Sequence, residues 1–292
     1  MSNVLFDAPG PTAVRRHRLI AVATVIVLIA IAVAVVWKLA VEGQFTAERW
    51  EPFVTPSIIT LLLEALVKTM QAAVLAILAA VVVGVVLGVG KLSDHRLLRW
   101  PSWTVVEFFR AVPLLMLILF IWTIQGNALN TIVPLVIGLT LYNGSVLAEV
   151  FRAGVNAVPK GQAEAAYAIG MRKGQVMRII QLPQAVKIML PAIVSQCVVA
   201  LKDTSLGFYI LAPGLTVAGR EIWRTFDNKL AVAIVLAAVY IVLNLLLELL
   251  ASFLEKRMNA GQVTIVAGQV QAQAGGGQSV AGVGFGAGGA DN

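Results

Sequence analysis

The chain has 292 residues, of which 59% are hydrophobic and only 13% are charged, and its mean hydropathy is +0.88. Soluble domains usually carry about 25% charged residues, so this composition excludes a soluble protein and indicates an integral membrane protein. The formal net charge of +7 does not indicate nucleic-acid binding, because the basic residues cluster between apolar runs, where they report membrane topology.

Six apolar runs are long enough to cross a bilayer as helices, which takes about 20 residues each. The sequence lacks the short alternating segments of a membrane barrel, so we expect an all-α integral membrane protein. Lys38 and Glu42 follow the first run in place of a small-residue cleavage site, which favours a helix over a secretory signal. The expected spans are 19–41, 58–90, 104–125, 131–152, 188–212 and 230–254.

Basic residues are distributed unevenly between the two sides that these spans define. Fourteen lie before the first span, between the second and third, between the fourth and fifth, and after the sixth, whereas Arg49, Arg220, Arg224 and Lys229 lie on the opposite side. The positive-inside rule therefore places both termini, including segment 1–18, in the cytoplasm. The Gly-, Ala- and Gln-rich tail, 258–292, lacks a periodic apolar face, and we expect it to be disordered.

The sequence contains no pattern for catalysis or metal binding. Cys197 is the single cysteine, which excludes an intrachain disulfide and a multi-cysteine metal site, and His17 and His95 lie far apart in basic stretches. The nearest match to a phosphate-binding loop, GVVLGVGK (84–91), has the wrong spacing and lies in an apolar run. Its glycines are better explained by close helix packing, so we do not expect this chain to hydrolyse ATP.

The segment 153–187 is too polar to cross a bilayer. Its centre, GQAEAAYAIGMRKGQVMRIIQLP (161–183), predicts two short helices with a corner at Gly170. Pro183 is expected to limit helical continuation at Leu182. By periodicity alone, the segment is as compatible with an ordinary interfacial loop as with an element that docks into a soluble partner.

The same residues carry a resemblance to a known family. Glu164-Ala165-Ala166, then Gly170, Ile180 and Leu182-Pro183, resemble the EAA loop of membrane subunits of ABC importers. The stretches FFRAVPLL (108–115), LYNGSVLAEVFRAGV (141–155) and LKDTSLG (201–207) are similar to the polar amino acid permeases. The resemblance is strongest to actinobacterial glutamate permease subunits.

This resemblance implies a type I ABC importer transmembrane domain over 57–257, preceded by an extra helix and outer loop, 19–56. It also implies separate ATPase subunits that bind ATP and magnesium, a second permease, identical or homologous, and an extracytoplasmic substrate-binding protein. This chain would bind no cofactor and would lie in the bacterial cell membrane. The extra helix, Ser145-Val146 in place of the more frequent Ala-Tyr, and the tail depart from the family pattern. The residues expected to couple to the ATPase are Gln162, Glu164, Ala165, Ala166, Gly170, Met171 and Pro183.

Charged residues within the spans are interpreted in two ways, because ionisable groups at membrane depth usually face a cavity or one another. Helical spacing favours ion pairs for three couples: Glu64–Lys68, Glu107–Arg110 and Glu149–Arg152. The family resemblance implies that the last two couples could brace a cytoplasmic gate. Lys202 and Asp203 are adjacent, so they point about 100° apart on a helix, and they could hold the two charges of an amino acid. The alternative is burial against neighbouring helices.

The tentative substrate site also includes the hydroxyl groups of Thr204 and Ser205, with Asn143 and Ser145 as weaker candidates. The preferred function is the permease subunit of an ABC importer for a polar amino acid, with glutamate favoured. An ion-gradient-driven transporter and a non-transporting assembly subunit are the alternatives. The sequence decides neither the amino acid nor whether the pore is a homodimer or a heterodimer.

Overall fold

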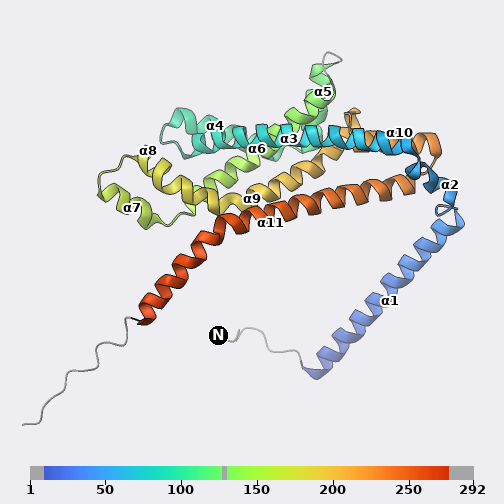
Figure 1. Cartoon of the computed structure of the whole chain (residues 1–292), viewed down its shortest axis with the longest axis horizontal. Coiled ribbons are helices and arrows are strands. Elements are labelled where there is room, and N and C mark those ends of the chain that lie inside the picture. The colour runs from blue at the N-terminus through green and yellow to red at the C-terminus, as the bar shows by residue number, and fades with distance from the viewer. Residues whose placement is uncertain (1–9, 127–129, 276–292) are drawn as a thin grey trace, which may run out of the picture. The chain divides into compact units, whose positions relative to one another are not determined.

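The structure is a computed structural model that describes residues 10–126 and 130–275, and helices dominate this part of the chain (Figure 1). In chain order the helices are α1 Pro11–Val41, α2 Ala47–Trp50, η1 Glu51–Val54, α3 Pro56–Leu92, α4 Arg96–Ala111, α5 Leu114–Gln125, α6 Ile132–Asn156, α7 Lys160–Ala168, α8 Lys173–Gln175, η2 Val176–Gln181, α9 Leu182–Asp203, η3 Thr204–Ile210, α10 Leu215–Phe226 and α11 Lys229–Gly275. Of the η elements, η1 and η3 are 3-10 helices and η2 is a π-helix.

The described chain divides into two compact units. The smaller unit contains the residues up to Glu64 together with Ala218–Ala237, and the larger contains Ala65–Val217 and the residues from Ala238 onward. In the smaller unit, the Arg49 guanidinium donates a hydrogen bond to the carbonyl of Asp227 at 2.5 Å, and the Asn228 amide donates one to the carbonyl of Arg49 at 3.0 Å. All of the candidate functional residues lie in the larger unit.

Within the described residues, five helices are long and apolar enough to cross a membrane, and a sixth span results if α4 and α5 count together. This agrees with the expected number, but the first helix begins earlier and the last helix ends later than expected. Helix α1 begins at Pro11, not at residue 19, and α11 extends into the segment predicted as a tail. Residues 276–292 of that tail lie outside the described part. The long α1 is exposed along its described side chains, as expected of a helix surrounded by lipid.

The predicted third span, 104–125, is wrong as a single helix. Helices α4 and α5 meet at a bend of 102° around Val112 and Pro113. Proline lacks a backbone N–H and disfavours the helical conformation of the preceding residue. Val112 is accordingly extended, with φ −77° and ψ 128°.

The prediction that the helix would be limited at Leu182 is also wrong. The chain is helical from Lys173 to Ile210, and Pro183 lies at the start of α9, directly after the π-helical turn η2. The wider turn changes the hydrogen-bond pattern just where the missing N–H of proline would break an α-helix. Lys202 and Asp203 consequently form the last two residues of α9, before the 3-10 helix η3, and do not lie in the middle of a helix.

Helix α3 contacts α6 through a stripe of small residues at four-residue spacing. Ala76, Ala80, Gly84 and Gly88 are buried along this stripe. A Cβ atom on Gly84 would lie only 2.7 Å from the Leu147 Cβ and 3.1 Å from the Gly144 carbonyl oxygen. Small residues allow this close backbone approach in membranes, which confirms the packing interpretation of the glycines.

Another face of α3 carries large side chains at the same spacing and is exposed. Val74, Leu78, Val82 and Val86 have exposed fractions of 47–64%. Because both stripes repeat every four residues, they follow the helix at a constant angular separation. The sequence of α3 therefore encodes which face packs against protein and which faces lipid.

We expect Gly84→Val to destabilise the protein by about 1–3 kcal/mol, because the added carbons overlap the α6 backbone. The measurement is the thermal unfolding midpoint of the full-length protein in detergent. Val82→Leu, which adds a methylene group to the exposed face, is the control and should leave the midpoint nearly unchanged. Equal midpoints for the two variants would contradict the close α3–α6 contact.

Candidate functional site

The EAA segment forms the predicted helix, glycine corner and second helix. Helix α7 ends with the Gly170 amide bonded to the Tyr167 carbonyl at 2.9 Å and the Met171 amide bonded to the Ala166 carbonyl at 3.1 Å. These two bonds are the Schellman arrangement, which requires a left-handed residue at the corner. Gly170 has φ +86°, a conformation that glycine adopts without strain.

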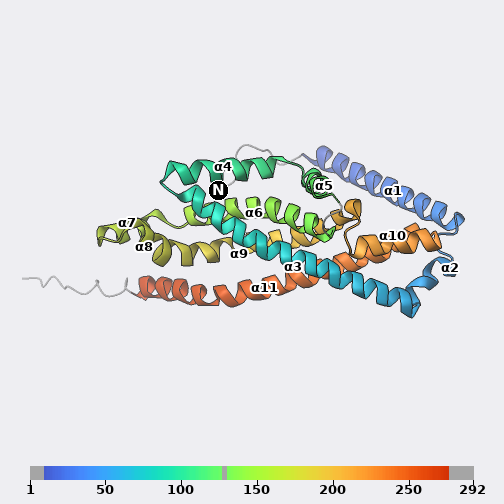
Figure 2. The same ribbon diagram turned by 90° about the horizontal axis from the view of Figure 1, so that it is seen from above.

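The segment projects from one end of the larger unit, where Figures 1 and 2 both show α7 and α8 beyond the ends of α6 and α9. Ala166 is the one buried residue of α7, and it packs the helix onto the protein. Among the other residues expected to couple, Gln162, Glu164, Ala165, Gly170 and Pro183 are exposed and Met171 is half-buried. Ile169 and Ile179 are 80% and 61% exposed. The projection therefore offers both charged and apolar surface to a partner.

A buried lysine connects the two predicted ion pairs. The Lys91 side chain is 3% exposed and forms ion pairs with Glu107 on α4, at 3.4 Å, and with Glu149 on α6. The predicted pairs are confirmed, with Glu107–Arg110 at 3.6 Å and Glu149–Arg152 at 2.9 Å. Lys91 is one of the fourteen basic residues that predicted the topology, and its place in this network was not anticipated. Its three-residue separation from buried Gly88, on the same face of α3, is the signal that could have found it.

The third predicted pair is wrong, because no ion pair joins Glu64 to Lys68 among the described side chains, and both are exposed. A different pair links two cytoplasmic segments of the expected topology. Asp94, in the turn between α3 and α4, forms an ion pair with Lys173 at the start of α8. The hydrogen bond and charge of Lys173 lower the pKa of the Asp94 carboxyl below its usual value. Lys173 thus favours the charged form of the Asp94 carboxyl.

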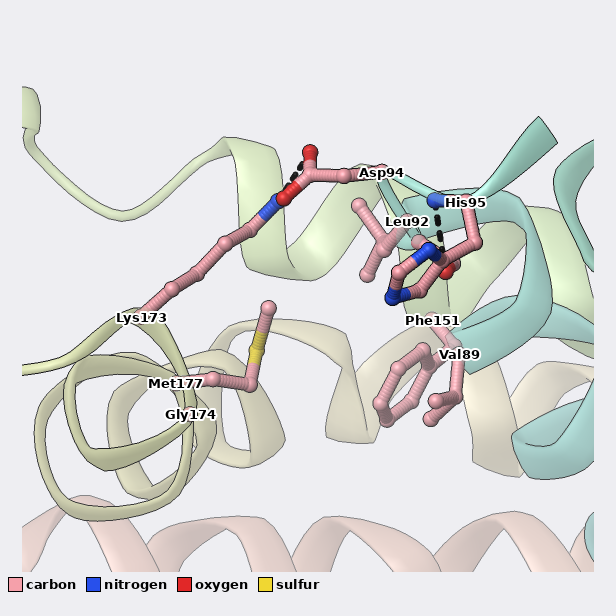
Figure 3. Close-up of a pocket in the computed structure, with 9 residues that line it drawn as sticks. Val89, Leu92, Asp94, His95, Phe151, Lys173, Gly174 and Met177 are labelled. Carbon is pink, nitrogen blue, oxygen red and sulfur yellow. Dashed lines mark hydrogen bonds and ion pairs between the residues drawn. The ribbon is translucent and has the colours of Figure 1, made fainter.

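The Asp94–Lys173 pair lies at the rim of a cavity of about 270 Å³. Figure 3 shows the Lys173 side chain extending toward Asp94, with Met177, Leu92, Val89 and Phe151 around the apolar space between the two segments. The turn after α3 and the start of α8 therefore meet through one exposed ion pair above an incompletely filled apolar contact.

The residues at the end of α9 differ in their surroundings. Lys202 is exposed, Asp203 and Ser205 are half-buried and Thr204 is buried. No ion pair involves Lys202 or Asp203 within the described ranges. The Thr204 hydroxyl donates a hydrogen bond to the Leu201 carbonyl at 2.7 Å. Lys202 and Asp203 are therefore more available to a ligand than Thr204 is.

Two buried threonines, Thr69 and Thr204, and the half-buried Tyr240 hold η3 and its neighbours together, and this cluster was not anticipated. The Tyr240 hydroxyl of α11 shares hydrogen bonds with Thr204 and with Thr69 of α3. Thr69 also accepts a hydrogen bond from the Leu215 amide at 2.9 Å. Since Thr204 belongs to this cluster, its hydroxyl has a structural role.

The two weaker substrate candidates on α6 also make structural hydrogen bonds. Asn143 is buried, donates to the Leu139 carbonyl at 2.9 Å and accepts from the Gln196 amide of α9 at 2.6 Å. Ser145 is buried and donates to the Leu141 carbonyl at 2.8 Å. The Asn143–Gln196 bond is a helix–helix contact of the kind that stabilises membrane bundles.

Comparison with known proteins identifies the family. The model of the family described as "Binding-protein-dependent transport system inner membrane component" matches residues 76–260. The chain belongs to this family. It is a permease subunit and not an enzyme, and its location is the cell membrane.

Individual relatives of this permease have been named as amino acid transporters. The glutamate transport system permease protein GluD of Corynebacterium glutamicum is 42% identical over 230 residues, which cover 76% of this chain and 84% of GluD. The glutamate/aspartate import permease protein GltK of Escherichia coli O157:H7 is 28% identical over 215 residues, covering 70% and 96%. The match to GluD includes most of both chains.

Solved structures give the same fold. A chain of an amino acid ABC transporter crystallised with histidines aligns with a TM-score of 0.65 and 29% identity, covering 68% of this permease and 94% of that chain. A chain of the MetNI methionine ABC transporter, 18% identical, aligns with a TM-score of 0.62 over 70% of this permease. The predicted all-α fold of an ABC importer transmembrane domain is therefore confirmed.

The buried Lys91 leads to a stability prediction. Lys91→Met keeps the length of the side chain but leaves Glu149, which is only 18% exposed, without one of its two cations. Removing one partner of a buried pair is strongly destabilising, and we expect a loss of about 3 kcal/mol. The measurement is the thermal midpoint of the purified permease, and Lys91→Met with Glu149→Gln should recover part of the loss.

Lys173→Met is the matched control, because it breaks an ion pair whose two side chains are 49% and 73% exposed. Exposed pairs contribute little to stability, so this variant should move the midpoint far less than Lys91→Met. An equal shift in both variants would mean that Lys91 is not a buried network residue.

Proposed function

We propose that this permease imports glutamate as part of an ABC importer in a bacterial cell membrane. Support comes from GluD and GltK, whose names give glutamate and glutamate/aspartate as their substrates. An exposed lysine, Lys202, beside the half-buried Asp203 provides complementary charges for an amino acid. Family membership gives no support to an ion-gradient-driven transporter or to an assembly subunit.

The EAA segment is proposed as the contact with a separate ATPase. The observation that carries this proposal is the corner at Gly170, which turns the chain after α7 and leaves Glu164 and Ile169 exposed. ATP and magnesium would be bound by that ATPase. Movement of the segment would be passed to α9, because α8, η2 and α9 form one helical stretch from Lys173 onward.

Two further partners complete the proposal. An extracytoplasmic binding protein would deliver glutamate, and a second permease, identical or homologous, would form the other half of the pore. Both termini are proposed to be cytoplasmic, since fourteen basic residues lie on their side of the membrane and four on the other. Labelling of a cysteine introduced at Gln175 in intact, unpermeabilised cells would contradict this orientation.

The coupling role predicts opposite results for two nearby glycines. Gly170 and Gly174 both have open space around an added Cβ, but only Gly170 has a positive φ. We expect Gly170→Ala to strain the corner by about 1–2 kcal/mol and to lower both uptake and ATPase activity in the reconstituted complex. Gly174→Ala should keep both.

Glu164→Lys, which inverts an exposed charge, should assemble less well with the ATPase. Normal coupling in Gly170→Ala and in Glu164→Lys would refute the docking role.

The substrate role predicts a change in half-saturating concentration. Asp203→Asn preserves shape but removes the charge that would bind the substrate ammonium. A hydrogen bond to a charged group contributes about 1.5–3 kcal/mol, so the half-saturating glutamate concentration should rise about tenfold or more. Lys202→Ala should abolish transport while assembly persists. Substrate-stimulated ATPase activity measures both effects, and Asn143→Ser is the comparison for a structural hydrogen bond. An unchanged concentration for an assembled Asp203→Asn complex would place the substrate elsewhere.

A further inference from the structure

The beginning of α4 carries an exposed face with an unusual combination of side chains. Arg96, Arg99, Trp100 and Trp103 are spaced i, i+3, i+4 and i+7, so they lie on one side of the helix. Trp100 and Trp103 are 65% and 53% exposed, and Leu97 between the arginines is 89% exposed. Large apolar and cationic groups are thus presented together.

The two arginines of this face have no ion-pair partner among the described residues. The nearest acidic residue along the chain, Asp94, already pairs with Lys173. Neither Arg96 nor Arg99 forms a salt bridge in residues 10–126 or 130–275. Two arginines in a membrane protein are therefore free to bind an anion from outside the chain.

The face also contains a cavity of about 350 Å³ lined by Arg99, Trp100 and Trp103. Arginine recognises phosphate through paired hydrogen bonds. Tryptophan places its apolar ring at the level of lipid headgroups, and basic residues beside a membrane attract anionic lipids. A ligand of this face must therefore carry both a phosphate with negative charge and an apolar part, and a lipid with a negatively charged headgroup has both.

We propose that the face formed by Arg96, Arg99, Trp100 and Trp103 is a binding site for an anionic phospholipid. The arginines bind the phosphate and headgroup charge, and the indole rings contact the glycerol and upper acyl chains. A soluble acidic protein would use the arginines but would not need the two exposed tryptophans and Leu97 beside them.

The site is linked to the buried charge network. The Lys91 Nζ lies 5.9 Å from the centroid of the Trp103 ring, within the range of a cation–π interaction. Trp103 is therefore shared between the proposed lipid site and the charge network around Lys91.

The test uses tryptophan quenching by brominated lipids in the full-length permease. The protein is reconstituted in phosphatidylcholine vesicles that contain increasing brominated phosphatidylglycerol or brominated phosphatidylcholine. The Trp100→Phe/Trp103→Phe variant gives the signal of the remaining tryptophans, so the difference reports this face. We expect a preference for brominated phosphatidylglycerol, to which each arginine contributes about fivefold in relative affinity.

Three variants separate this site from a general attraction of charge. Arg96→Gln/Arg99→Gln should lose the preference at Trp100 and Trp103, and Arg96→Lys/Arg99→Lys should retain most of it. Arg15→Gln/Arg16→Gln removes the same charge from α1 and should retain all of it. Equal quenching by the two lipids in the unmodified permease would overturn the proposal. A preference for brominated phosphatidylglycerol that survives in Arg96→Gln/Arg99→Gln would also overturn it. So would a preference that an added soluble acidic peptide abolishes without the lipids competing against that peptide.

Discussion

The buried ammonium group of Lys91 is the constraint on which the arrangement of the permease core depends. An unpaired charge in a poorly hydrated interior is very unfavourable, so α4 and α6 must bring Glu107 and Glu149 to the end of α3. They can do so because α3 and α6 approach closely at Gly84 and Gly88. The small-residue stripe and the ionic network therefore both fix how α3 packs against α6.

This network lies close in sequence to the turn that reaches the EAA segment. Asp94 follows Lys91 by three residues and pairs with Lys173 at the start of α8. The EAA segment is thus connected to the core through one exposed ion pair, Asp94–Lys173, and one buried ionic network around Lys91. The end of α3 joins the two. The exposed pair is the part that can break and re-form at little cost, which suits a segment proposed to move with a partner. The buried network is the part that keeps its geometry.

The sequence predicted those features that are local. Apolar run lengths gave the spans, and the EAA pattern gave the helix, corner and helix around Gly170. Helical spacing gave the Glu107–Arg110 and Glu149–Arg152 pairs. Features that depend on distant partners were missed, because the pairing of Lys91 with α4 and α6 requires knowing which faces meet. The bend at Pro113 and the continuation through Pro183 show the same limit, since one proline ends a helix and the other follows a π-helical turn that accommodates it.

The charges around Lys91 are paired within the protein, whereas Lys202 and Asp203 have no ion-pair partner among the described residues. This difference bears on the roles of the two sets. Lys91, Arg110 and Arg152 share two carboxylates, which leaves the network with one excess positive charge but every described member paired. Lys202 and Asp203 lie at the end of α9 without a salt bridge in the described residues. A permease must release what it binds, so its substrate contacts cannot be held by strong internal pairs. Charges that the protein itself leaves unpaired fit that requirement, and fully paired ones do not.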